Sequence, residues 1–399
     1  MSNPPRPSRW AATAAPTTPR TSGGLVARRG AGAPVIGSAP DAAPSPEVAP
    51  RRGAAPRPTR LELWQLALGV LFLLGAATAA VVIGPADLSP GAVLAELASR
   101  IPGIGVHSSL SPTDAAIVFQ LRLPRICLGM LVGAMLALAG SSYQGVFQNP
   151  LADPYLLGVA SGAGLGATLV LVELPSAASW PFNPLPVAAF AGAILGVVAT
   201  FALGRGAGRA RSPSSLILAG VAVGSFFTAA QTFLQQRDTP VLAEVYSWIL
   251  GGLSTAGWGQ VGLIAPYIAL SAVVLVSCRR LLDVLSVGDD EAGSLGVRAR
   301  RVRLVVIIAA TLGTAAAVSV SGLIGFVGII IPHTIRLFVG PSYRRIMPLS
   351  VLFGGGFLVL CDLLARSVVA PGEVPLGVVT AFLGAPFFLV VLRQSRRLT

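Results

Sequence analysis

The sequence contains no lysine, and all 29 of its basic residues are arginine. The phosphate-binding loop of P-loop ATPases needs a lysine that reaches the β- and γ-phosphates, so this chain cannot form such a site. Charged residues are also scarce, at 11% against about a quarter in ordinary soluble domains. Apolar residues make up 53% of the chain, and the mean hydropathy is +0.75. These values exclude an ordinary soluble domain and argue against nucleic-acid binding despite the formal charge of +13.

Cysteine and histidine are rare as well. Cys127, Cys278 and Cys361 lie far apart inside apolar runs, which fits neither a disulfide framework nor a zinc site. His333 has no second ligand nearby in the sequence. We therefore expect no bound metal and no cofactor.

The first sixty residues differ from the rest of the chain. They hold 12 prolines and almost no bulky apolar residue, so they cannot bury enough surface to offset the entropy of ordering. We predict that residues 1–60 are a disordered, arginine- and proline-rich cytoplasmic tail, and that residues 61–399 are a transmembrane domain.

Long apolar runs dominate the remaining sequence. A membrane-spanning helix needs about 20 predominantly apolar residues. About ten such runs occur, at 62–84, 119–147, 155–174, 185–204, 214–235, 259–282, 303–321, 323–340, 346–367 and 374–393. The sequence thus predicts an all-α, polytopic membrane protein of about ten helices with both termini on one side.

Arginine placement predicts the orientation. If the amino-terminal tail is cytoplasmic, all but five of the 29 arginines lie on the cytoplasmic side, as the positive-inside rule requires. Arg100 and Arg237 are exceptions in polar loops. The other three exceptions, Arg122, Arg125 and Arg366, lie at the outer ends of predicted spans.

These three arginines allow two interpretations. They can extend toward lipid headgroups, and Arg366 can pair with Asp362 four residues before it on one helix. Alternatively, they form a docking surface for carboxylates of an external partner, since a guanidinium binds a carboxylate bidentately.

The glycine-rich stretches and the few acids near the membrane spans do not indicate a catalytic or ion-coupled site. The stretch Ser161–Ala167 (SGAGLGA) superficially suggests a dinucleotide loop, but it follows no strand and lies in an apolar run, which favours close helix packing. Acids and histidines lie only near the span ends, which disfavours a proton- or sodium-coupled carrier.

One cytoplasmic loop has the pattern of a contact for a partner that supplies energy. Its sequence is SVGDDEAGSLGVRARRVR. Asp289, Asp290 and Glu291 are placed to cap a short helix, which Gly293 and Gly296 would then end. A solvated loop is the alternative interpretation.

Several motifs occur in an order that resembles a known family. They include RLPR (Arg122–Arg125), YSWILGGLSTAGW (Tyr246–Trp258), LSVGDDEAGSLGV (Leu285–Val297), GLIGFVGIIIPHTIRLFVG (Gly322–Gly340) and GEVPLGVVTAFLGAPFF (Gly372–Phe388). Over residues 62–397 the chain resembles the FecCD family, the BtuC-like permease subunits of ABC importers for iron–siderophore complexes, haem and cobalamin.

The resemblance implies ten membrane helices and a dimer of permeases, either homodimer or heterodimer, in the bacterial plasma membrane. It implies two cytoplasmic ATPase subunits, which use ATP and Mg, and an extracytoplasmic binding protein that docks on Arg122, Arg125 and Arg366. The fifth and tenth spans would line the translocation path, with Thr228, Gln231 and Gln235 as candidates, although a polar face buried between two helices has the same pattern. The residues implied in ATPase contact are Gly288, Asp289, Asp290, Glu291, Ala292, Gly293, Leu295 and Gly296.

The expected function is thus ATP-driven uptake, most often of ferric siderophores in this family, with no covalent chemistry in this chain. A secondary carrier or passive channel is the alternative. A membrane-embedded lipid enzyme would need carboxylates or histidines clustered at one interface, and the sequence has no such cluster.

Overall fold

The computed structural model describes residues 61–86, 88–103, 107–174, 182–206, 213–237 and 239–395. The predicted tail, residues 1–60, lies outside the described residues. Every regular element within those ranges is a helix, which confirms the all-α prediction.

The helices follow in chain order. They are α1 (Leu63–Val82), α2 (Pro90–Ser99), α3 (Pro112–Ala116), the π-helical turn η1 (Ile117–Arg122), α4 (Leu123–Phe147), α5 (Val159–Glu173), α6 (Pro184–Gly206), α7 (Pro213–Arg237), the 3₁₀ turn η3 (Thr239–Val241), α8 (Leu242–Ile249), α9 (Trp258–Ser277), α10 (Arg279–Leu285), α11 (Asp289–Ser294), α12 (Ala299–Ser321), α13 (Val327–Val339), α14 (Tyr343–Ser367) and α15 (Leu376–Ser395).

Each of the ten predicted apolar runs overlaps a helix. Among the described residues, 7 helices are long and apolar enough to cross a membrane, and three shorter apolar helices fall in α5, α13 and α15. The count of ten spans therefore stays a prediction. The boundary between α12 and α13 lies where the sequence placed it, because α12 ends at Ser321 and Gly322 follows with a φ of 64°.

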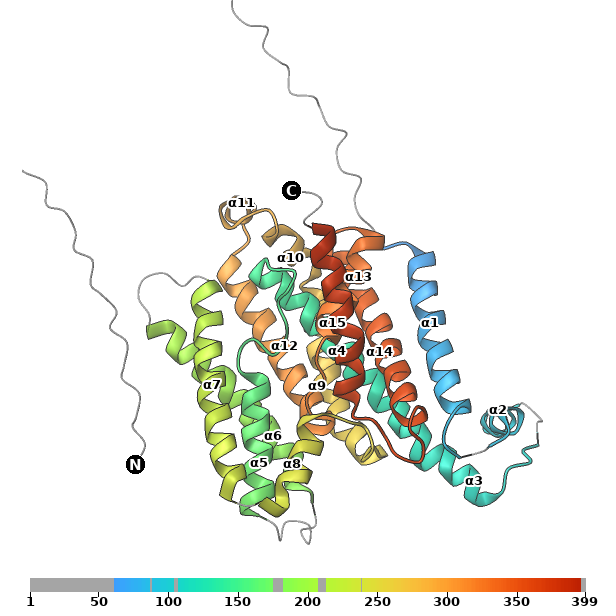
Figure 1. The fold of residues 1–399 in the computed structure, drawn as a ribbon. Helices are drawn as coiled ribbons and strands as arrows, with labels where there is room; N and C mark the ends of the chain where they lie inside the picture. The colour runs from blue at the N-terminus through green and yellow to red at the C-terminus, as the bar shows by residue number, and fades with distance from the viewer. Residues whose placement is uncertain are drawn as a thin grey trace, which may run out of the picture. The chain divides into compact units, whose positions relative to one another are not determined.

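The short helices gather at the two ends of the helical bundle. Figure 1 shows α10 and α11 at the same end as the start of α1 and the end of α15, whereas α2, α3 and α8 lie at the opposite end. The sequence did not predict α2, α3 or α8, because each is shorter than a span and lacks a long apolar run.

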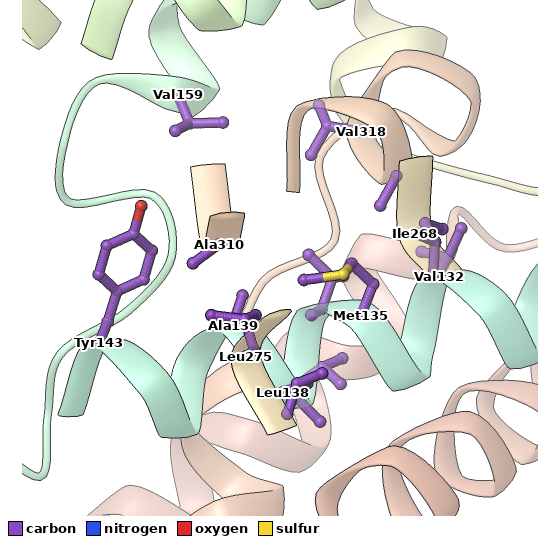
Figure 2. Close-up of a cluster of buried hydrophobic side chains, with 14 of the residues drawn as sticks. Val132, Met135, Leu138, Ala139, Tyr143, Val159, Ile268, Leu275, Ala310 and Val318 are labelled. Carbon is purple, nitrogen blue, oxygen red and sulfur yellow. The ribbon is translucent and has the colours of Figure 1, made fainter. Parts of the chain in front are cut away.

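The core is built around α4. Figure 2 shows Met135 and Leu138 of α4 among side chains from α5, α9 and α12. Tyr143 is fully buried, and its hydroxyl lies 2.8 Å from that of Thr311 on α12. This bond satisfies two polar groups that would otherwise be costly to bury.

Glycines set the helix spacing, as predicted for the SGAGLGA stretch. A Cβ on Gly162 of α5 would collide with the carbonyl oxygen of Gly192 on α6, and one on Gly166 with that of Ala188. A Cβ on Gly133 of α4 would likewise collide with the Gly354 carbonyl of α14. Close backbone approach with small residues is the usual packing of membrane helices.

Candidate functional site

Arg122 holds the carboxyl end of α1. The last carbonyls of a helix have no partner within it. Arg122 Nη1 donates to the carbonyl oxygens of Val81 at 2.7 Å and Val82 at 3.3 Å, and Nη2 donates to that of Ala86 at 2.8 Å. The residue is 4% exposed. Its guanidinium therefore attaches α1 to η1 and α4.

Arg366 reaches the same end of α1 from α14. Its Nη2 donates to the Ala80 carbonyl, and its Nε lies 3.8 Å from Oδ2 of Asp362. Arg366 is also 4% exposed. Two buried arginines from different helices thus supply the hydrogen bonds that α1 lacks at its end.

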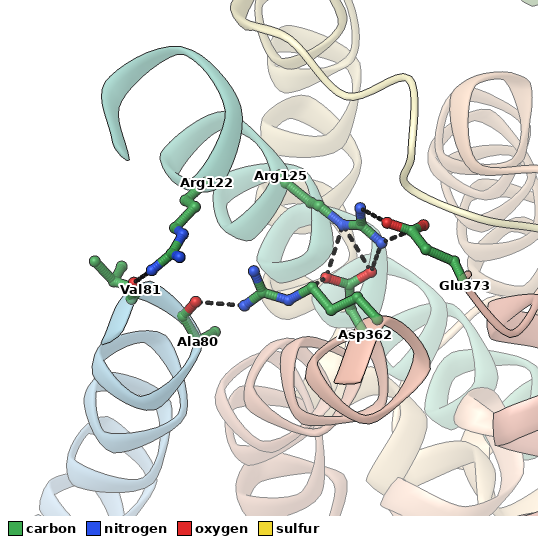
Figure 3. Close-up of polar contacts among 7 residues, drawn as sticks. Ala80, Val81, Arg122, Arg125, Asp362 and Glu373 are labelled. Carbon is green, nitrogen blue, oxygen red and sulfur yellow. Dashed lines mark hydrogen bonds and ion pairs between the residues drawn. The ribbon is translucent and has the colours of Figure 1, made fainter. Parts of the chain in front are cut away.

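Arg125 lies between two carboxylates (Figure 3). Its Nε donates to both carboxylate oxygens of Asp362 at 3.0 Å, and its Nη2 donates to Oδ1 at 2.8 Å. On the other edge, Nη1 and Nη2 donate to Glu373 at 2.7 and 3.0 Å. The Asp362 side chain is 4% exposed and that of Glu373 is 39% exposed, so one carboxylate is internal and the other faces outward.

The structure thus brings the three predicted arginines into one group, here called the arginine cluster: Arg122, Arg125 and Arg366 with Asp362 and Glu373. Asp362 does pair with Arg366, but its shorter bonds go to Arg125 on α4. Sequence reasoning missed Glu373. It is an acid in the loop that shares this end of the bundle with the three arginines, and that is the signal that could have identified it.

Glu373 remains ionised beside Arg125. The hydrogen bonds from the Arg125 guanidinium hold the pKa of the Glu373 carboxyl below its ordinary value, more than burial raises it. At neutral pH the outward edge of Arg125 is therefore occupied by the ionised carboxylate of Glu373 from the same chain.

A cavity of about 510 Å³ adjoins the arginine cluster. Arg125, Asp362 and Glu373 form part of its wall, together with Glu244 of α8 and Ser321 at the end of α12. The backbone joins these segments as well, since the Leu376 amide donates to the Gly251 carbonyl at 2.9 Å. The cavity and this hydrogen bond thus link the arginine cluster to α8, to the end of α12 and to the start of α15.

At the opposite end, the predicted coupling loop forms the short helix α11. Asp289, Asp290 and Glu291 occupy its first turn, where negative charge is favourable, although no side chain caps it. Gly293 is the last residue but one of the helix, which ends at Ser294, between the two glycines predicted to end it. The chain turns at Gly296, with a φ of 78°, which an L side chain adopts with difficulty.

The helix α11 is fixed on one side and exposed on the other. Ala292 is fully buried, and Asp289 accepts two hydrogen bonds of 2.7 Å from Arg303 of α12. Leu295 and Val287, just outside the helix, are 68% and 66% exposed. These two apolar side chains lie on the exposed side of α11.

The three predicted path residues lie on one side of α7 by their spacing but differ in exposure. Thr228 is exposed and lines an open groove with Ser225 and Thr232. Gln231 and Gln235 are each 8% exposed, and Gln231 lies against Gly164 of α5. For Gln231 the structure therefore matches the alternative of a polar side chain buried between helices.

Within the described ranges, no three His, Cys, Asp or Glu side chains gather as a metal site. The long apolar helices and polar ends define a multi-pass membrane protein. Comparison with known proteins then identifies the family. Residues 68–394 match the model of the FecCD transport family. The chain belongs to this family.

Two relatives and one solved structure illustrate the match. The chain is 41% identical over 282 residues to the cobalamin import system permease protein BtuC of Halobacterium salinarum, covering 71% of this chain and 74% of the relative. It is 35% identical over 315 residues to the Fe(3+)-citrate import system permease protein YfmE of Bacillus subtilis, covering 79% and 90%.

The solved structure is a metal-chelate type ABC transporter in an inward-facing conformation. It superposes with a TM-score of 0.71 at 30% identity, over 82% of this chain and 98% of that one. The chain is accordingly a permease of the ABC-importer type.

Proposed function

We propose that this chain is one of two permease subunits of an importer for ferric siderophores in the bacterial plasma membrane, with both termini in the cytoplasm. Two separate ATPase subunits supply energy from ATP, and an extracytoplasmic binding protein delivers the cargo. The family match over residues 68–394 carries this proposal, and likeness to iron and metal-chelate transporters supports the cargo class. Cobalamin is the second candidate, because a cobalamin permease is 41% identical.

The proposed work of this chain is mechanical. ATP binding shifts a two-state gate only if the partner interacts differently with the two states. The helix α11 supports this role, because its exposed apolar flank can bind an ATPase subunit while the Asp289–Arg303 ion pair joins it to α12. We place the path between two permease subunits, with Thr228 on its surface.

Docking of the binding protein is assigned to the end that carries the arginine cluster. Arg125 is the member with an outward edge, whereas Arg122 and Arg366 act from behind it by holding α1. A carboxylate of the binding protein would reach Arg125 by replacing Glu373.

An uptake assay that distinguishes ATP from ion gradients as the energy source tests the proposed function. Proteoliposomes that contain the permease and its ATPase subunits are expected to take up a ferric siderophore from the binding protein only when ATP is enclosed. Collapse of the ion gradients should leave the rate unchanged. Parallel assays with haem and cobalamin identify the cargo, and uptake that follows an ion gradient without ATP would establish a secondary carrier instead.

Leu295 tests the coupling contact. Leu295→Asp places a charge on the exposed apolar flank of α11 and should weaken association with the ATPase subunit at least about tenfold, equivalent to about 1.4 kcal/mol. Folding should be unaffected, since Leu295 is 68% exposed. The matched control is Leu94→Asp, an exposed leucine of α2 at the other end. Equal ATPase affinity for both variants would remove α11 from the contact.

A further inference from the structure

A groove runs along α6 and α12, and its smaller hollow also touches Phe147 of α4 and Leu216 at the start of α7. It shares no lining residue with the cavity beside the arginine cluster or with the groove that contains Thr228. It consists of two adjoining hollows of about 280 and 430 Å³. The two share the walls formed by Phe201, Leu304 and Ile307. Because the hollows have walls in common, they form one continuous surface, here called the α6–α12 groove.

The larger hollow of the α6–α12 groove is almost entirely apolar. The larger hollow is lined by aliphatic and aromatic side chains, with one threonine, Thr311. Val198 and Ile308 on its walls are 57% and 59% exposed. In a membrane protein these side chains face hydrocarbon rather than water.

The other part of the groove is charged at its mouth. Arg300, Arg303 and Asp289 line the smaller hollow beside the apolar wall of Phe147 and Leu304. Both carboxylate oxygens of Asp289 accept bonds from Arg303, whereas Arg300 is exposed and has no hydrogen bond or ion pair with another described residue. Together, Arg300, Arg303 and Asp289 carry a formal net charge of +1.

The distance along α12 from Arg300 to Thr311 matches the thickness of one leaflet of the bilayer core. Arg300 and Thr311 are eleven positions apart on α12, and a rise of 1.5 Å per residue separates them by about 16 Å along the axis. Half of a bilayer core of about 30 Å has nearly the same depth. A molecule whose charged group contacts Arg300 can therefore extend an acyl chain along the whole groove.

We propose that the α6–α12 groove binds an anionic phospholipid. The phosphodiester, with its single negative charge, contacts Arg300, and one acyl chain lies against Phe201, Leu304 and Ile307. Arginine is well suited to this contact because its planar fork matches phosphate geometry. The headgroup would lie beside the Asp289–Arg303 ion pair, so the lipid composition of the membrane would act directly on the attachment of α11 to α12.

Lipid retention by the full chain in detergent tests the site. Native mass spectrometry after titration with phosphatidylglycerol should show one retained lipid, and Arg300→Gln should lower the bound fraction at least fivefold. The matched control is Arg301→Gln, an exposed arginine of the same helix turn that does not line the groove. It should bind like the unaltered chain.

A second variant tests the acyl chain. Ala202 lines the larger hollow and is exposed, so Ala202→Phe fills the groove without entering the core. This variant keeps Arg300 and Arg303, and it should still reduce the fraction of bound lipid. Excess glycerol phosphate, which has no acyl chain, should not displace the lipid. Equal losses in Arg300→Gln and Arg301→Gln, equal retention of phosphatidylcholine, or displacement by glycerol phosphate would each overturn the proposal.

Discussion

Replacement of Asp362 by alanine is expected to destabilise the protein by about 3–5 kcal/mol, the usual effect of removing one partner of a buried ion pair. Asp362 is 3% exposed and is the internal carboxylate for both Arg125 and Arg366. Without it, two guanidinium groups stay inside the bundle with only one outward-facing acid near them. Thermal unfolding of the purified permease in detergent measures the change.

Glu373→Ala provides the matched control for Asp362→Ala. The Glu373 side chain is 39% exposed, so its loss should cost no more than about 1 kcal/mol. The double variant Asp362→Asn/Arg125→Gln removes both charges of the main pair and should be more stable than Asp362→Ala, because no charge of that pair is left uncompensated. Equal melting temperatures for Asp362→Ala and Glu373→Ala would contradict the internal role of Asp362.

Glu373→Gln is expected to tighten binding of the solute-binding protein about tenfold, equivalent to about 1.4 kcal/mol. Glu373 occupies the outward edge of Arg125 through bonds of 2.7 and 3.0 Å. An amide holds that edge less strongly than a carboxylate does, so a partner carboxylate replaces it at lower cost. Titration of the purified permease complex with the binding protein measures the affinity.

The control for this prediction is Glu244→Gln. Glu244 lines the same cavity but makes no hydrogen bond or ion pair with Arg125. Equal tightening in both variants would indicate long-range charge rather than competition for Arg125, and weaker binding in Glu373→Gln would indicate that Glu373 positions Arg125. Charge reversal at Arg122 or Arg366 is a poorer test of docking, because both residues also hold the end of α1.

The sequence predicted the helices well because burial in lipid imposes a pattern that length and hydropathy reveal directly. The division of α12 from α13 at Ser321 and Gly322 illustrates this. The short helices α2 and α8 were missed, because helices of 10 and 8 residues leave no comparable signal.

The site was predicted less completely. Charge bias identified Arg122, Arg125 and Arg366, since arginine on the outer face is exceptional. Helix spacing identified Asp362 as a partner of Arg366. Neither pattern identified the shorter Arg125–Asp362 contact, because it joins residues 237 positions apart and three-dimensional packing creates it. Similarly, the sequence placed Thr228 and Gln231 on one helix but did not show that α5 covers Gln231.

The absence of an internal proline from α12 has a mechanical consequence. It contains no proline, whereas α9, α13 and α14 each carry one inside. Its 23 residues extend about 34 Å at 1.5 Å per residue. One end is tied to α11 through Arg303, and the other reaches the cavity beside Arg125 through Ser321. If α11 binds the ATPase as proposed, a displacement of α11 along the α12 axis would reach the cavity beside Arg125, because α12 has no internal proline at which it would bend.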